Sequence, residues 1–287
     1  MVLLKKWYLL ATAIVGIILV VLGVVWMTAI FPALAKMPAD YEREINFNGN
    51  FNVFDLATQQ LQEIPIVMVR DHKAIGVEGN ALLIKEVVTV THAQDGTDLS
   101  EQYGSEDDLA VDRSTRQHVP GLGDMDREGG FGFPSWVSKE QSYPVWNPKA
   151  AASMDAHFVA EEEFRGLKVL VFQIDEKDIV APASEQMPVE GTMDTTIVFR
   201  VEPVTGVTIT NDSLTTVRVP MMGEDPVFIG TTTFAEETIA ELMDLAGSNR
   251  TKLLWFRTYL PWLVIGLGII ALVAVAIVVA ITARQKP

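Results

Sequence analysis

Residues 7–31 read WYLLATAIVGIILVVLGVVWMTAIF and residues 260–283 read LPWLVIGLGIIALVAVAIVVAITA, and neither stretch contains a charged side chain. An α-helix rises 1.5 Å per residue, so each stretch makes a helix roughly 36 Å long, enough to cross a hydrocarbon core of about 30 Å. Pro32 ends the first stretch, and Pro261 fits the first turn of a helix in the second. We therefore predict transmembrane helices over both ranges.

Basic residues flank the two predicted spans on the same side of the membrane. They are Lys5 and Lys6 before the first span, and Arg284 and Lys286 after the second. Because basic flanks mark the cytoplasmic side, residues 1–6 and 284–287 are predicted to be cytoplasmic termini. Residues 32–259 then form one domain outside the cytoplasm, which makes the chain a double-pass membrane protein.

A cleaved signal peptide is the alternative reading of the first span. Ala33, Leu34 and Ala35 have the small-x-small pattern of a cleavage site. However, the apolar region of a signal peptide normally has only about 7–15 residues, fewer than residues 7–31 provide. We expect a retained anchor.

Small residues within the spans could allow the helices to approach one another closely. Gly16 and Gly23 lie in the first span and Gly266 in the second. Glycine permits tight packing between membrane helices, although it is also common in any span. Because neither span contains an acidic or basic residue, a charged path through these helices is not expected.

The central segment is strongly acidic. All 37 Asp and Glu lie in it, against 18 of the 22 Lys and Arg, a formal net charge of −19. Such a surface repels nucleic acid and anionic head groups. The chain has no cysteine, so disulfides, thiolate catalysis and cysteine-ligated metals are excluded.

The central segment reads mainly as β-strands joined by short turns. The candidate strands are residues 81–91, 167–174, 195–202, 207–210, 213–219 and 227–234. Turn signals follow at Pro203–Gly206 and at Asn211–Asp212. This order favours a mainly β domain, an antiparallel sandwich or barrel, flanked by the two transmembrane helices.

One amphipathic helix is predicted at the end of this domain. Thr233 and Glu236 have capping-box spacing. An apolar face follows at Ile239, Leu242, Met243 and Ala246, and Gly247 and Asn249 are expected to end the helix. We expect that face to pack against the β domain. Residues 94–132 read as a long polar excursion with a short strand near 109–112.

Two groups of acidic residues are candidate cation sites. Asp124, Asp126, Glu128 and Gly129 begin like a calcium loop, but Ser135 occupies the position that should supply a bidentate glutamate. The second group is Asp95, Asp98, Glu101, Glu106, Asp107 and Asp108. Solvated acidic loops are the expected state of both, so we predict no metal site.

No catalytic or cofactor motif is found. The histidines are His72, His92, His118 and His157, and no two of them have metal-ligand spacing. There is no G-x-S-x-G, P-loop or dinucleotide fingerprint, and the glycines around Leu122 lack strand-to-helix context. We therefore assign no catalytic, cofactor-binding or metal residues, and we expect a protein without enzymatic activity or cofactor.

Residues 131–146, FGFPSWVSKEQSYPVW, concentrate five aromatic side chains. They could form an exposed recognition loop. Because large aromatic rings dominate core burial, we expect instead that they cover one end of the β domain.

Several segments resemble those of one family. They are the first span with residues 31–38 (FPALAKMP), residues 111–115 (VDRST), Phe133–Pro134 with Lys139, Tyr143 and Trp146, residues 166–169 (GLKV), residues 201–206 (VEPVTG) and the second span. On these the chain resembles the DUF3068 family of porin PorA family proteins over essentially its whole length. The resemblance implies a membrane protein with a β-rich domain, and the family label implies a channel.

The expected function is that of a membrane-anchored cell-envelope protein whose β domain binds a partner, either an envelope lipid or another envelope protein. The first alternative is a subunit of an oligomeric channel. One copy cannot be a β-barrel porin, because the spans are helical and the β segment is acidic. A homo-oligomer would therefore be needed. An envelope hydrolase is the second alternative, and it predicts a cleft with convergent carboxylates or histidine.

Overall fold

The computed structural model describes residues 2–183 and 189–284. The chain divides into two compact units: residues 1–36 with 249–287, which carry two long apolar helices, and residues 37–248, which carry the β-sheet. This confirms the predicted fold class, a mainly β domain flanked by two apolar helices. Lys286 and the side chains of Lys5 and Lys6 lie outside what the structure describes.

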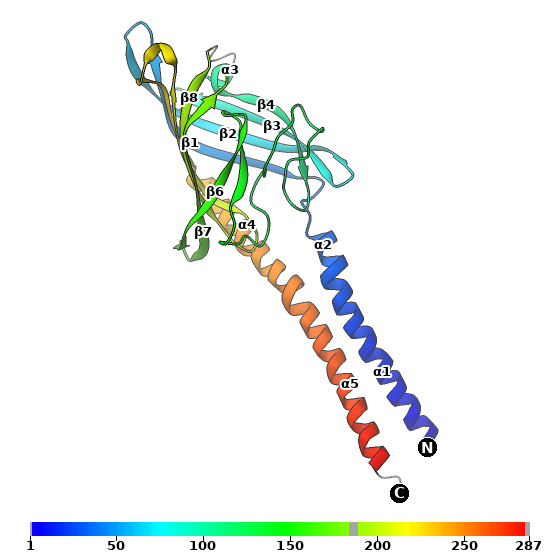
Figure 1. Ribbon diagram of the computed structural model, residues 1–287. Coiled ribbons are helices and arrows are strands. Elements are labelled where there is room, and N and C mark those ends of the chain that lie inside the picture. The colour runs from blue at the N-terminus through cyan, green and yellow to red at the C-terminus, as the bar shows by residue number, and fades with distance from the viewer. Residues whose placement is uncertain (1, 184–188, 285–287) are drawn as a thin grey trace. The chain divides into compact units, whose positions relative to one another are not determined.

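The β unit is built on one curved antiparallel sheet of ten strands, a half-barrel (Figure 1). The strands are β1 (Glu42–Asp55), β2 (Gln60–Glu78), β3 (Ala81–His92), β4 (Ser105–Asp112), β5 (Tyr143–Asn147), β6 (Ala152–Phe164), β7 (Leu167–Ala181), β8 (Gly191–Val201), β9 (Thr208–Arg218) and β10 (Pro226–Phe234). Their order is β4-β3-β2-β1-β10-β9-β8-β7-β6-β5. All pairings except β1 with β10 join strands that are adjacent in sequence, as a meander requires.

An irregular segment connects the two edge strands of this sheet. His118 pairs with Val111 of β4, while Gly130 pairs both with Gln117 and with Val145 of β5. The backbone N–H of Gly130 also donates to the Pro144 carbonyl at 2.7 Å. Unpaired sheet edges invite association with other chains, so this segment protects both edges at once. The predicted polar excursion is therefore a structural closure of the half-barrel.

Side-chain alternation gives the sheet an apolar face and a polar face. On β1, Phe47 and Phe51 are buried, whereas Asn48 between them is exposed. Four clusters fill the apolar face, the largest around Phe172, Phe199 and the loop residue Phe133. The sheet is thus a single layer whose core is covered by its own curvature, by loops and by one helix.

That helix, α4 (Glu236–Leu254), confirms one expectation and corrects two. Ile239, Leu242 and Ala246 are buried against Phe47 and Phe234, as predicted. The expected capping box is wrong, because Thr233 belongs to β10 and its hydroxyl donates to Asp212. The expected end of the helix is also wrong. Gly247 and Asn249 are helical, and α4 continues through a π-helical turn into α5 (Leu260–Arg284).

The strand predictions were right in kind: residues 81–91 and 227–234 match β3 and β10 to within one residue, whereas the other predicted strands differ in length. Residues Thr208–Arg218 form one strand, so the predicted turn at Asn211–Asp212 does not exist. The turn at Pro203–Gly206 is confirmed, with Gly206 at φ 69° and its N–H bonded to the Glu202 carbonyl. Short elements complete the unit: α3 (Ser100–Tyr103) and a 3₁₀ turn at Pro220–Met222.

The other unit is a helix pair in which α1 and α5 lie side by side (Figure 1). The first helix comprises α1 (Val2–Val25), the π-helical turn η1 (Trp26–Ile30) and α2 (Phe31–Leu34). A second π-helical turn, η3 (Trp255–Tyr259), precedes α5. Both helices contain stretches long and apolar enough to cross a membrane.

Glycines set the distance between these helices. A Cβ on Gly16 would lie 2.9 Å from Leu272 Cγ, and one on Gly23 would overlap Ile265. Gly268, which sequence reasoning did not single out, would meet the Gly16 carbonyl oxygen at 2.7 Å. A Cβ on Gly266 would meet nothing within 4 Å, so this residue does not serve the contact. Close packing therefore depends on three specific glycines.

Candidate binding site

The turn between β5 and β6 holds the side chain of Lys149 against aromatic rings of the apolar face. Asn147 is buried, and its Oδ1 accepts the backbone N–H groups of Lys149 at 3.0 Å and Ala150 at 3.3 Å. This is the geometry of an Asx turn. Ala151 then takes φ 48°, in the left-handed region, to enter β6. The turn thereby fixes the place from which the lysine extends.

Two aromatic rings lie beside this lysine, and a third packs against one of them. The ring of Phe51 lies 5.1 Å from the ring of Tyr103 and 5.2 Å from that of Phe228. The Nζ atom of Lys149 lies 4.3 Å from the Phe228 centroid and 5.6 Å from the Phe51 centroid. These distances are those of a cation–π contact. We call these four residues the Lys149 cluster.

The Lys149 cluster combines an accessible charge with apolar surroundings. The lysine side chain is exposed, whereas Phe51 is buried and Phe228 is half-buried. Desolvation lowers the pKa of Lys149 to about 8, and it raises the pKa of Tyr103. Among the described residues no carboxylate forms an ion pair with Lys149. An ammonium group and a phenol next to apolar rings can recognise an amphipathic molecule.

Sequence reasoning missed this site. The four residues come from β1, α3, the β5–β6 turn and β10, and no spacing in the sequence links them. The only local signal is Asn147-Pro148 before Lys149, which indicates a turn but not what the lysine meets.

A second hollow, of about 660 Å³, lies on the polar face of the sheet. It is shallow and opens to solvent. Its walls carry amides, hydroxyls and one carboxylate from four central strands, including Asn48, Asn50, Asp212, Thr231 and Thr233. The carboxylate of Asp212 is already engaged by Arg200 and Thr233. The polar groups that the hollow offers are therefore mainly neutral, and they lie among apolar residues that include Val198 and Leu214.

A buried polar cluster lies beneath the closing segment, on the apolar face of β2 and β3. His72 Nε2 lies 2.5 Å from Glu86 Oε2, and Arg70 lies 3.7 Å from the same oxygen. Burial alone would raise the pKa of Glu86, but Arg70 and His72 outweigh it and lower it to about 2. Desolvation lowers the pKa of His118 to about 4. The ring of Phe131 packs edge-on against both histidines.

Arg116 fastens the closing segment to the turn after β8. Its guanidinium donates to the carbonyl oxygens of Phe133 at 2.5 Å, Thr205 at 3.0 Å and Gly206 at 3.3 Å. Within that turn, Glu202 is fully buried and accepts the N–H and hydroxyl of Thr205 at 2.7 Å each. This contact is structural.

The acidic candidates do not converge. Asp124 pairs with Arg127 and accepts the Asp108 N–H, while Asp126 accepts the Gly121 N–H at 2.7 Å. In the second group, ion pairs and turn hydrogen bonds occupy the carboxylates of Asp95, Asp98, Glu106, Asp107 and Asp108. Within residues 2–183 and 189–284, no three His, Asp or Glu side chains are placed to hold a metal ion.

The remaining sequence candidates are placed as follows. His92 ends β3 and contacts Asp95 at 2.9 Å, and exposed His157 lies 2.7 Å from Ser142 Oγ. In the aromatic segment, Phe133 and Tyr143 are buried, which confirms that it contributes to the core. The Tyr143 hydroxyl also accepts the Ser138 N–H at 2.7 Å.

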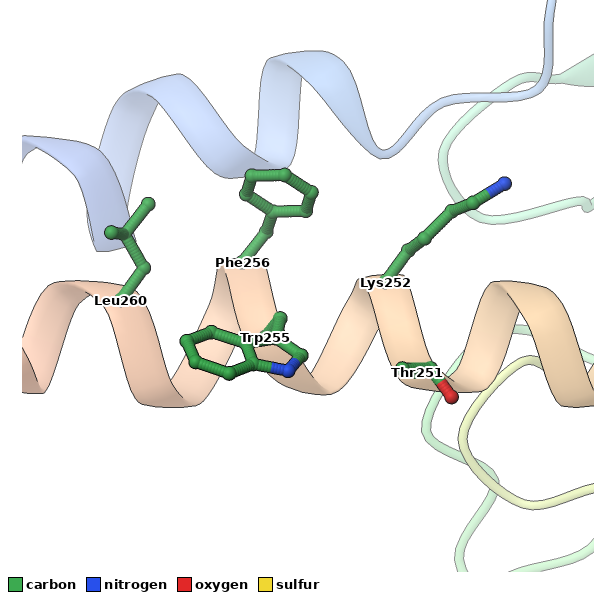
Figure 2. A pocket seen from close by; sticks show the side chains of 5 residues that line it. All are labelled: Thr251, Lys252, Trp255, Phe256 and Leu260. Carbon is green, nitrogen blue, oxygen red and sulfur yellow. The ribbon is translucent and has the colours of Figure 1, made fainter.

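The helix pair has its own small hollow, of about 230 Å³, beside the second π-helical turn. It is lined by Thr251, Lys252, Trp255, Phe256 and Leu260, and Phe256 points toward the first helix (Figure 2). The indole N–H of Trp26 donates to the Phe256 carbonyl at 2.7 Å. The two π-helical turns are therefore joined by a hydrogen bond.

Comparison with known proteins identifies the family to which this chain belongs. A search of curated proteins gives no match to the chain. A family model described as "Porin PorA" matches residues 10–277, which includes most of both apolar helices and the whole sheet. Residues 111–115, one of the segments on which the resemblance rests, have structural roles: Asp112 accepts the N–H groups of Ser114 and Thr115, and Arg113 donates to the Met37 carbonyl. The chain belongs to the porin PorA family.

Proposed function

We propose that this chain is a double-pass protein of the cell envelope whose β domain lies outside the cytoplasm and binds a partner without catalysis. Membership of the porin PorA family and two apolar helices support association with a membrane. The observation that carries partner binding is the Lys149 cluster, where the ammonium group of an exposed lysine lies over two rings and forms no ion pair with a carboxylate among the described residues. Ligand sites commonly combine apolar and aromatic side chains with a few polar groups, as this cluster does.

An envelope lipid fits this cluster better than a folded protein does. Two rings from different strands lie beside one charged group, and the Tyr103 ring packs against one of them, which suits a slender molecule. A protein interface normally needs a broad complementary surface of about 800 Å² per partner. The expected partner is therefore a lipid, with an envelope protein as the competing occupant.

Native mass spectrometry of the full-length protein, extracted in a mild nonionic detergent, tests this function. A monomer or dimer carrying a species of defined mass is the expected result. A bound polypeptide would favour the protein partner. Protein without any bound species, from several detergents and growth conditions, would contradict partner binding.

A channel subunit is the second candidate, because the matching family is described as a porin. Neither described span contains a charged residue, from Trp7 to Leu34 or from Leu260 to Ala283. A conducting pore would therefore need the helices of several copies around an apolar lumen. Planar-bilayer recordings on purified oligomers decide the matter. Reproducible unitary conductance would support the channel, and a silent bilayer with a verified oligomer would exclude it.

A further inference from the structure

We propose that the Lys149 cluster binds an anionic amphiphile, with its carboxylate or phosphate head group on Lys149 and its hydrocarbon part against the half-buried Phe228. The inference rests on the proposed partner binding and names the class of ligand.

The ammonium group of Lys149 is available to a ligand. The β domain is rich in carboxylates, and the ammonium groups of Lys73, Lys85, Lys139 and Lys168 all form ion pairs. Lys149 is directed instead toward the faces of two rings. A ring attracts an ammonium group but accepts none of its three N–H donors with full strength. Those donors remain able to bind an anion.

An anion would bind strongly to the Lys149 ammonium group. Charge-assisted hydrogen bonds from ammonium to carboxylate or phosphate are about twice as strong as neutral ones. The surroundings of Lys149 are partly desolvated, as the lowered pKa of its ammonium group indicates. An attraction between opposite charges is weakened less by solvent in such a place than on the open surface.

Apolar side chains near Lys149 suit the hydrocarbon part of the ligand. Val53, Ile64 and Leu99 are partly buried and pack around Phe51 in the same core cluster. Phe228 joins this cluster to the one around Phe172. Each methylene that the ligand buries there adds to its affinity, so a chain of several carbons strengthens binding.

The charge of the domain narrows the ligand class further. A net charge of −19 in the central segment disfavours polyanions such as nucleic acid or heavily phosphorylated sugars. A cationic head group is repelled by Lys149 itself. A hydrocarbon chain that carries one or two negative charges avoids the strong repulsion of a polyanion by the domain and the repulsion of a cation by Lys149.

Calorimetric titration tests the proposal on the full chain in phosphatidylcholine nanodiscs, with empty nanodiscs as the reference. The probes are octyl phosphate, the uncharged octanol and octyltrimethylammonium. Octyl phosphate is expected to bind at least tenfold more tightly than octanol, and octyltrimethylammonium more weakly than octanol. Equal affinity for the three probes would overturn the assignment of an anionic head group.

Four variants locate the site. Lys149→Met should reduce octyl phosphate affinity to that of octanol, and Lys149→Arg should keep at least a third of it. Phe228→Ala should weaken octyl phosphate and octanol alike. Lys168→Met, which removes a lysine already paired with Glu161, is the matched control and should change nothing. An unchanged affinity in Lys149→Met would overturn the site. If the purified protein still carried its own ligand in that variant, partner binding would stand and only this inference would fall.

Discussion

Arg116 offers the sharpest stability test, because one side chain joins the closing segment to the turn after β8. Replacement by methionine keeps most of the aliphatic stem and removes the guanidinium donors. The two shortest contacts reach the Phe133 and Thr205 carbonyls at 2.5 and 3.0 Å. Hydrogen bonds to a charged group contribute about 1.5–3 kcal/mol each, and relief from burying the guanidinium offsets part of the loss. We expect Arg116→Met to lower the free energy of unfolding by about 3 kcal/mol.

The assay is urea unfolding of the full-length protein in detergent micelles, followed by tryptophan fluorescence. Trp136 reports on the same segment, since its backbone N–H donates to Val204 at 3.1 Å. A loss of that size should lower the urea midpoint by about 1 M or more. Arg165→Met is the control: this arginine pairs with exposed Glu236 in full contact with solvent, so its replacement should leave the urea midpoint nearly unchanged. A loss below about 1 kcal/mol in Arg116→Met would refute the reasoning.

Three further predictions follow from burial, helix packing and topology. Burial lowers the pKa of His118 from its ordinary range to about 4. The contribution of this neutral histidine to stability is therefore full above about pH 6.5 and falls as the pH decreases toward 4. In urea titrations across this range, His118→Asn should remove about 2 kcal/mol of that loss, a figure that allows for the partial exposure of the histidine. Gly23→Leu should separate the helices and speed hydrogen exchange of the Trp26 indole N–H at least tenfold by NMR, whereas Gly266→Leu should leave it unchanged. A single cysteine at exposed Lys73, in this cysteine-free chain, should react with a membrane-impermeant maleimide on intact cells, and labelling only after lysis would contradict the proposed topology.

The elements predicted correctly from sequence are those whose signal is local. The two apolar helices follow from uncharged runs, and the buried strand β7 begins with the apolar run at Leu167. The apolar face of α4 follows from the spacing of Ile239, Leu242 and Ala246. Each of these signals depends on neighbouring residues alone.

The features that were missed depend on contacts between distant residues. In β1, asparagines alternate with Phe47 and Phe51, and asparagine normally disfavours strands, so this long strand was not predicted. Asn211 and Asp212 resemble a turn, yet pairing with β8 on one side and, at Asp212, with β10 on the other keeps them extended. The helix does not end at Gly247, because the chain continues without a break into α5. The Lys149 cluster is assembled from four separate segments and has no local signature.

The measurement that tests the central claim most directly is photo-crosslinking in living cells with p-benzoylphenylalanine in place of Phe228. Leu56, which is 84% exposed in the turn between β1 and β2, provides the control position. Mass spectrometry of the purified protein then identifies whatever is attached. We predict a lipid adduct of discrete mass at position 228, absent at position 56 and lost when Lys149→Met is added. No adduct at position 228, or the same adducts at both positions, would contradict a ligand site in the β domain.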